Sequence, residues 1–428
     1  MILHKNSEQF DIIVIGGGPA GMMAAGRAAQ RGAKVLLVEK TYRLGSKLLL
    51  TGGGKCNITN NAEMDDMTAA FGKNGKFLYR ALTVFSNHDL IEFFTSRGVP
   101  MHVESGGRVL PTDNNAEGVL AVLCAFLTEH NVHILHNTTC PTIHYGPEKK
   151  ESIKGVTLSD NSTKTTANLI IATGGKSYPA TGSTGDGYEM AKQSRHTIVP
   201  LSPGLSALES NYSYIKELQG LTLKNIAISV IVDDKKKCEE NGGILFTHFG
   251  VSGPNILNLS GKVIDALANN GKVELSLNLR PDYSTREFDA ILQKEFIVFG
   301  PRTVAQYFKK TLPASLSLVF EKLGSSTSNK QCSMVCREER KTIAALFTDL
   351  RIPIIGARPI EKATITRGGV SLKEINPQTM ESRRVKGLYF CGELIDLAGI
   401  TGGYNLQEAF STGYLAGESA AERISVIK

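Results

Sequence analysis

The stretch from Asp11 to Lys40 constrains the fold of this chain most strongly. It contains a short apolar run, a glycine cluster, a helix-like run of small residues, and a second apolar run that ends in Glu39. This order is typical of a βαβ unit, in which a crossover helix joins two parallel strands. We therefore expect an α/β fold built on a Rossmann-like domain.

The glycines of this unit predict a dinucleotide site. Gly16, Gly18 and Gly21 fit Gly-x-Gly-x-x-Gly, which permits a tight turn, close approach to a pyrophosphate, and close packing of helix on strand. Free N–H groups and the helix dipole favour the pyrophosphate at the helix N-terminus. An acid at Glu39 favours a ribose without a 2′-phosphate, as in FAD or NAD. The expected contacts at this end are Gly16, Gly18, Pro19, Ala20, Gly21, Glu39 and Lys40.

Composition excludes several other classes of protein. The 428 residues are enough for two or three domains, and 41% are hydrophobic and 21% charged. The charge-free run Ile12–Gly26 is too short and glycine-rich to span a bilayer, and Met1–Phe10 lacks the apolar region of a signal peptide. We therefore expect a cytoplasmic protein without a membrane partner. A net charge of +7, spread along the chain, permits an RNA partner and gives no indication of DNA.

The cysteines do not indicate a disulfide framework or a metal site. There are seven, an odd number with scattered spacing, and no Cys-x-x-Cys occurs. Cys332 and Cys336 could share one helix face as half of a zinc site. Such a site needs two more ligands nearby in space, so no metal is expected.

A second ligand-capable segment follows the βαβ unit. Residues 41–60 show no regular periodicity and contain three consecutive glycines followed by Lys, Cys, Asn, Ile, Thr and Asn. A long polar loop rich in donors beside a dinucleotide site is usually functional, although a flexible surface loop is the alternative. The expected contacts are Lys47, Thr51, Gly52, Gly53, Gly54, Lys55, Cys56 and Asn57.

Two distant segments are expected to return to the same site. Leu169–Gly175 is a buried strand ending in paired glycines, and Gly387–Glu393 is a strand ending in Gly-Glu. Ile400–Asn405 leads into a last helix from Leu406 to about Ile424. The free amides of that helix would face the region of a flavin where negative charge accumulates on reduction, although an ordinary glycine-capped helix is the alternative. The expected contacts are Thr173, Gly174, Gly175, Gly392, Glu393, Gly402, Gly403, Tyr404 and Asn405.

The middle of the chain has a different character. Prolines and a glycine after His196 mark a boundary, β-branched and alternating runs continue to about residue 280, and helical spacing covers about 284–350. We expect an inserted domain at 196–360, β-barrel-like over about 196–280 and helical over about 284–350. The two parts of the nucleotide-binding domain are then 1–195 and 361–428, and the first part includes a helical pattern at 77–98.

Together these motifs resemble the BaiN/RdsA-type (YhiN-like) family of FAD-dependent oxidoreductases. The matching stretches span nearly the whole chain: Gly52–Asn60, Ala172–Tyr188, Leu245–Pro254, Thr366–Glu374 and Leu388–Gly413. The resemblance implies a two-dinucleotide-binding-type flavoprotein with FAD as cofactor and a family-specific insert. It places Gly16, Gly18, Gly21 and Glu39 at the ADP half, and Gly52 to Asn57, Gly175, Gly392, Glu393, Gly403 and Asn405 at the flavin and ribityl region. Arg108–Asp113 departs from the Phe-Pro-Ser usual in the family, which leaves the role of this strand open.

The resemblance implies a reductase that passes hydride from NAD(P)H through the flavin to an activated C=C acceptor. The acceptor would be uridine in ribosomal RNA or an enoyl-type small molecule. Flavin supplies the redox chemistry, and the protein supplies position and a proton donor. Cys56 and His248 are the candidate donors, with a packed thiol and a structural histidine as the alternatives.

Two other functions stay open. One is an FAD-dependent amine oxidase that uses O2, and the other is a non-enzymatic, FAD-stabilised RNA-binding protein. No second Gly-x-Gly-x-x-Gly follows a strand-like run, so NAD(P)H is expected to bind only transiently.

Overall fold

The computed structural model describes residues 8–146 and 152–427, which form two compact units. One unit contains the chain up to Gly204 and from Ile360 onward, and the other is Leu205–Pro359. The first boundary lies after Gly204 rather than before His196, because strand β12 (Ile198–Gly204) pairs with β20 (Ile365–Val370) within the first unit. Residues 1–7, on which the expectation about a signal peptide largely depends, lie outside the described residues.

A parallel five-stranded sheet forms the centre of the first unit, in the order β21-β11-β2-β3-β7. Strands β11 and β2 pair side by side in this sheet, with Ile171 opposite Ile15. Four of its strands are fully buried, as expected where helices cover both faces of a parallel sheet. The expected Rossmann-like α/β fold is confirmed. The strands are β2 (Ile12–Ile15), β3 (Val35–Val38), β7 (His133–Leu135), β11 (Leu169–Ile171) and β21 (Leu388–Phe390).

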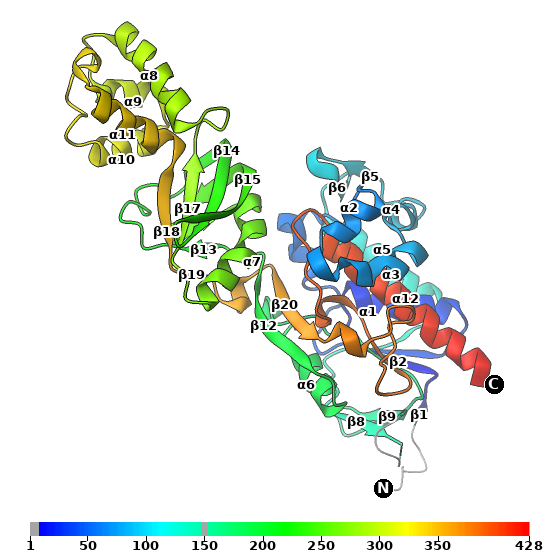
Figure 1. The fold of residues 1–428 in the computed structure, drawn as a ribbon. Coiled ribbons are helices and arrows are strands. Elements are labelled where there is room, and N and C mark those ends of the chain that lie inside the picture. Colours follow the sequence, from blue (N-terminus) through cyan, green and yellow to red (C-terminus); the bar gives the residue numbers. More distant parts are fainter. Residues whose placement is uncertain (1–7, 147–151, 428) are drawn as a thin grey trace. The chain divides into compact units, whose positions relative to one another are not determined.

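Helices α1 (Pro19–Gln30) and α12 (Tyr404–Ile427) pack directly against each other (Figure 1). A Cβ on Gly413 would lie 2.3 Å from the Ala20 carbonyl oxygen, and one on Gly417 would lie 2.3 Å from that of Ala24. These two glycines, about one helical turn apart, allow the two backbones to touch. The C-terminal helix is thereby held against the first helix of the βαβ unit.

Smaller elements surround this centre. The helical pattern expected at 77–98 is divided in two, because Ser86 begins a new helix through a capping box with Asp89. The helices are α2 (Met64–Ala69), α3 (Tyr79–Val84), α4 (Asn87–Thr95), α5 (Ala116–Glu129) and α6 (Asp186–Gln193). Two further sheets contain β4 (Thr59–Asn60), β5 (Met101–Val103) and β6 (Arg108–Pro111), and β1 (Glu8–Gln9), β8 (Thr142–Tyr145), β9 (Ile153–Thr157) and β10 (Thr163–Thr165).

The second unit has its own hydrophobic core and an antiparallel seven-stranded sheet, in the order β18-β17-β14-β15-β16-β13-β19. The two edge strands follow one another in the chain, so the sheet must curl to bring its edges together. The strands are β13 (Leu208–Glu209), β14 (Thr222–Val232), β15 (Lys235–Phe246), β16 (Gly250–Ser252), β17 (Val273–Asn278), β18 (Leu350–Ile354) and β19 (Gly356–Ala357). The helices are α7 (Pro254–Ala268), α8 (Thr285–Phe299), α9 (Val304–Thr311), α10 (Ala314–Leu323) and α11 (Arg337–Thr348).

Among the helices that the structure describes, none has both the length and the apolar composition needed to cross a bilayer.

Candidate functional site

The turn between β2 and α1 forms the first part of the site. Gly16 has φ 106°, and a Cβ on Gly21 would lie 1.8 Å from the Gly16 carbonyl oxygen, so both positions require glycine. Gly18 is the N-cap of α1 and its side-chain position is open, because a Cβ added there would have no atom within 4 Å. The first-turn amides of α1 therefore border open space, where an anion would be favoured.

Glu39 is fixed beside this turn at the end of β3. One carboxylate oxygen accepts a hydrogen bond from the Gly17 amide at 2.7 Å. The other accepts from the Thr41 amide at 2.7 Å and from the Thr41 hydroxyl at 2.8 Å. The carboxylate is 8% exposed and points at the glycine turn, the position that a ribose-binding acid requires.

The neighbouring cation turns away from this position. Lys40 donates to Asp186 at 2.7 Å and also contacts Thr184. Burial acts to raise the pKa of Asp186, but the hydrogen bonds from Lys40 and Thr184 outweigh it, so the pKa is lowered. Because the Lys40 ammonium is paired with this carboxylate, it is not aimed at a ribose 2′-position. This arrangement suits FAD, whose ribose carries no 2′-phosphate.

The loop after β3 contains left-handed backbone conformations, which few residues other than glycine adopt. Leu48–Gly54 forms a 3₁₀ segment that is interrupted at Thr51, and Gly52, Gly53 and Gly54 all have positive φ. No atom lies within 4 Å of a Cβ built on Gly53 or Gly54, so these positions border open space. Just beyond them, the Asn57 side-chain oxygen is buried and accepts no hydrogen bond from the described chain. An acceptor of this kind is usually paired with a donor from an ordered water or a bound group.

A polar network joins four distant parts of the sequence. Lys47 donates to Glu393 and to Ser177, both at 2.6 Å. The second Glu393 oxygen accepts from the Ser177 hydroxyl at 2.9 Å and from the Thr366 amide at 2.8 Å. The Lys47 and Glu393 side chains are 20% and 21% exposed. This network fixes the loop after β3 to the Gly-Glu segment that follows β21.

A second buried polar group without a partner lies shortly after strand β11. Thr173 lies two residues beyond the end of β11, and its hydroxyl is buried with no partner in the described chain. Gly174 and Gly175 come next, and a Cβ on Gly175 would lie 2.7 Å from a Glu393 carboxylate oxygen. The paired glycines therefore let the chain pass close to the Lys47–Glu393 network.

The loop before α12 completes the arrangement. Gly402 and Gly403 have positive φ, and a Cβ on Gly403 would lie 2.2 Å from the Thr59 carbonyl oxygen. Asn405 accepts from the Gly399 amide at 2.8 Å and donates to the Gly399 carbonyl at 3.1 Å. Its side chain therefore shapes the loop that precedes the helix.

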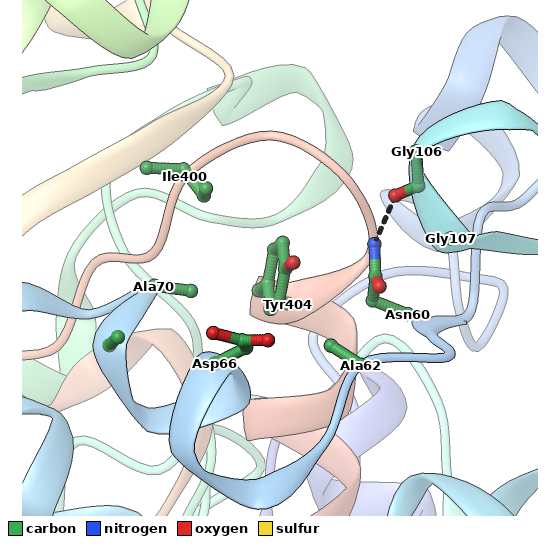
Figure 2. A pocket seen from close by; sticks show the side chains of 9 residues that line it. Asn60, Ala62, Asp66, Ala70, Gly106, Gly107, Ile400 and Tyr404 are labelled. Atoms are coloured by element: carbon green, nitrogen blue, oxygen red, sulfur yellow. Dashed lines mark hydrogen bonds between the residues drawn. The ribbon is translucent and has the colours of Figure 1, made fainter.

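A cavity of about 500 Å³ lies beside this loop. Asn60 donates to the Gly106 and Gly402 carbonyls, both at 2.9 Å, and so joins the two sides of the cavity. Figure 2 shows the Tyr404 ring at its centre, with the Asp66 carboxylate beneath it. Burial raises the pKa of Tyr404, and the Asp66 charge adds to this effect. The lining residues are Asn60, Ala62, Asp66, Ala69, Ala70, Gly106, Gly107, Ile400 and Tyr404.

The two candidate proton donors lie in different surroundings. Cys56 is fully buried in the first unit, and burial raises the pKa of its thiol to about 12, despite a hydrogen bond with Thr51. His248 belongs to the second unit, in the turn between β15 and β16, and is exposed, with its ring 5.0 Å from that of Phe249. The surroundings of Cys56 are those of a packed thiol, whereas the His248 side chain is exposed.

The two cysteines considered for zinc do not have a full set of ligands. Cys332 is buried and Cys336 is exposed at the start of α11. Within the described ranges, no group of three or more His, Cys, Asp or Glu side chains is arranged to hold a metal ion.

Sequence reasoning missed several of these residues. Ser177 and Thr366 complete the network around Glu393, and Asn60 and Asp66 line the cavity. The polar run after β3 is the only sequence signal that pointed toward Asn60. The others carry no local pattern, because their partners lie far away in the chain.

The sequence matches a known family over almost its whole length. The family described as "HI0933-like protein Rossmann domain" matches residues 10–419. A ribosomal RNA dihydrouridine synthase of Escherichia coli (strain K12) is 31% identical over 408 residues, which cover 95% of this chain and 97% of that protein. A 3-dehydro-bile acid delta(4,6)-reductase of Clostridium scindens is 29% identical over 413 residues, which cover 96% of this chain and 98% of that protein.

Solved structures with a similar fold are flavoenzymes. The open conformation of a flavocytochrome c3 fumarate reductase has a TM-score of 0.54 and 16% identity, and covers 98% of this chain and 79% of that one. A 3-ketosteroid-delta4-(5alpha)-dehydrogenase from Rhodococcus jostii RHA1 has a TM-score of 0.53 and 14% identity, and covers 98% of both chains. At these identities the likeness concerns the fold.

The residues around the glycine turn and the loop after β3 are suited to bind FAD. The open space at Gly18, the glycine-directed Glu39 carboxylate, and the buried unpaired polar atoms of Asn57 and Thr173 are the features that a dinucleotide would complete.

Proposed function

Because the chain belongs to the HI0933-like Rossmann family and is an FAD-dependent oxidoreductase, we propose that it is a reductase of activated C=C bonds. One observation carries the proposal: the two relatives described above, each matching at least 95% of this chain, are named for the saturation of a C=C bond. Dihydrouridine is uridine with two hydrogens added across its C=C bond, and a delta(4,6)-reductase is named for the double bonds it reduces. We propose NAD(P)H as the electron donor.

Bound FAD supplies the hydride chemistry, and the chain supplies binding, orientation and electrostatics. We assign the ADP end to the free amides of α1 and to Glu39. We assign the flavin end to the Gly52–Asn57 loop, which the Lys47–Glu393 pair holds in place. Hydrogen bonds within the chain hold Glu39 and the Lys47–Glu393 pair in place, which favours a pre-formed cofactor site.

Reduction of a C=C bond by hydride also requires a proton for the second carbon. We propose His248, one of the two candidates from the sequence, as the donor, because imidazole is the group best suited to exchange protons near neutral pH. Cys56 serves packing in this proposal, because its thiol is buried and its pKa is about 12. A general acid contributes about 10² to 10⁴ in rate.

The proton-donor assignment can be tested one half-reaction at a time. His248→Gln should slow reoxidation of the reduced enzyme by its acceptor about 100-fold or more, and leave reduction by NAD(P)H unchanged. His88→Gln, at an exposed position on α4, is the matched control. Loss of the acceptor step in a folded Cys56→Ala variant, with an unaffected His248→Gln variant, would transfer the role to Cys56.

The proposed acceptor is uridine in ribosomal RNA or an enoyl-type small molecule, in the cytoplasm. All seven cysteines are free thiols, which agrees with a reducing compartment. The decisive measurement is anaerobic: the FAD-loaded protein is bleached with NADH or NADPH and then mixed with an rRNA transcript or with an enone or dienone. We expect the flavin absorbance to return with one of these acceptors. Turnover of amines with O2 and no reduction by NAD(P)H would instead support an oxidase, and RNA binding without any flavin reduction would support a non-enzymatic role.

A further inference from the structure

Glu408 is a buried carboxyl that none of the roles above uses. It lies in the second turn of α12 and is 3% exposed. Glu39, the other carboxyl classed as buried in the described part of the chain, is held by three donors. Glu408 has no cation partner among the described residues, and its one side-chain contact is with Thr412.

The hydrogen bonds around Thr412 leave Glu408 with a single long side-chain hydrogen bond. The Thr412 hydroxyl has a single proton, and its shortest contact is with the Glu408 backbone carbonyl at 2.7 Å. The same oxygen accepts from the Gly392 amide at 3.0 Å and lies 3.5 Å from a Glu408 carboxyl oxygen. With its proton directed at the carbonyl, Thr412 has one lone pair left, which a protonated carboxyl can use as an acceptor.

The charges that face Glu408 act in the same direction. Burial is the main effect and the Glu393 carboxylate adds to it, and together they outweigh the hydrogen bond with Thr412 and raise the pKa of Glu408 to about 8. The Cys391 thiol is also buried beside it and has a raised pKa. On the α1 side, residues 19–26 contain no titratable side chain, and β4 contains none either. The charged side chains on α3 and α4, Arg80, Asp89 and Glu92, are exposed, and β21 contributes buried Tyr389, whose pKa burial raises. Lys47, the cation of this region, is bonded to Glu393 instead.

Glu408 is separated by only a few contacts from the expected diphosphate position. Thr412 binds the Gly392 amide, and a Cβ on Gly392 would lie 2.7 Å from the Ala20 side chain, in the first turn of α1. The first turn of α1 presents the free amides that suit a diphosphate. A charged carboxylate in this poorly solvated place would repel a dianionic ligand, whereas a protonated one would not.

We propose that Glu408 must carry a proton for FAD to bind, so that binding of the dinucleotide is coupled to proton uptake at this residue. The coupling rests on the FAD-binding fold and not on the identity of the acceptor. Glu408 is then a positioning residue that acts on the dinucleotide through Thr412 and Gly392. Above pH 8 the free protein must take up a proton in order to bind, so the apparent Kd for FAD should rise up to tenfold for each pH unit.

Equilibrium dialysis of the FAD-loaded, full-length protein between pH 6 and 9.5 tests this coupling, with released FAD measured by fluorescence. The wild-type Kd should be flat below about pH 7 and rise steeply above pH 8. Glu408→Gln, a neutral near-isostere, should hold FAD with the low-pH affinity over the whole range. Binding of FAD at pH 8, measured by calorimetry in two buffers of different ionisation enthalpy, should show uptake of about half a proton in the wild type and none in the variant.

Two results would overturn the proposal. One is a wild-type Kd that stays constant to pH 9.5. The other is a Glu408→Gln variant that keeps the wild-type pH profile, which would assign the proton to another group. If the variant does not fold, as judged by circular dichroism, the wild-type pH profile and the two-buffer calorimetry still decide whether a proton is taken up. Glu189→Gln, at an exposed position on α6, is the matched control and should keep the wild-type profile.

Discussion

Replacement of Lys47 by Met should destabilise the first unit measurably. The Lys47 ammonium lies 2.6 Å from Glu393 and 2.6 Å from Ser177, and both charged side chains are about one-fifth exposed. Exposed ion pairs contribute about 0–1 kcal/mol, whereas removal of one partner from a buried pair costs about 3–5 kcal/mol. Glu393 keeps the Ser177 hydroxyl and the Thr366 amide as donors, which limits the loss. We therefore expect a decrease of about 2 kcal/mol in the free energy of unfolding.

The assay is urea unfolding of the FAD-free protein, followed by circular dichroism, together with Tm. Because the chain has two compact units, the transition of the first unit must be resolved before a free energy is assigned. Lys192→Met is the matched control: its pair with Glu189 is exposed, and its loss should cost less than about 0.5 kcal/mol. A double-mutant cycle of Lys47→Met with Glu393→Gln should give a coupling energy of about 1–3 kcal/mol.

A Lys47→Met variant that is as stable as Lys192→Met would contradict this expectation. Such a result would mean that solvent screens the Lys47–Glu393 pair as strongly as it screens the exposed Lys192–Glu189 pair. A large loss for Lys47→Met with no coupling in the double-mutant cycle would place the effect in lost packing of the lysine stem.

Three other outcomes are expected. Gly21→Ala should cost at least about 1–3 kcal/mol and abolish FAD retention, because its Cβ would lie 1.8 Å from a backbone carbonyl, whereas Gly18→Ala should fold normally and only weaken FAD binding. In the native protein at pH 8, iodoacetamide should modify exposed Cys336 on the order of 100-fold faster than buried Cys56, as measured by mass spectrometry; equal rates would contradict the raised pKa of Cys56. Burial lowers the pKa of His196 in the folded protein. The free energy of unfolding is therefore highest above the pKa of His196 in the unfolded chain, and it decreases as the pH falls and the buried ring must take up a proton. His196→Gln should make the free energy of unfolding less sensitive to acidification from pH 7 to 5.

The βαβ unit shows how much of the fold can be predicted from the pattern of neighbouring residues. Asp11–Lys40 folds as expected because a glycine turn, a small-residue helix and two apolar strands each specify their own backbone. The strand at Leu169–Ile171 also returns to the sheet beside β2, as its uninterrupted apolar run indicated. The helical pattern at 77–98 was wrong in one respect, because the Ser86–Asp89 capping box starts a new helix within it.

The site itself depended on contacts between distant residues. The residue types at Lys47 and Glu393 suggested ligand contacts, but nothing in the local sequence indicated that the two pair with each other. Glu408 looks like an ordinary polar position in a helix, and only the packing of α12 within the first unit places it in the interior.

Local patterns of residues were therefore sufficient to predict the Rossmann-like unit, its nucleotide fingerprint and the family to which the chain belongs. Which polar groups are paired and which are buried, Glu408 among them, became visible only in the folded chain. This difference arises because backbone propensity and hydrophobic periodicity act over a few neighbouring residues, whereas desolvation and ion pairing depend on groups that folding brings from elsewhere in the chain.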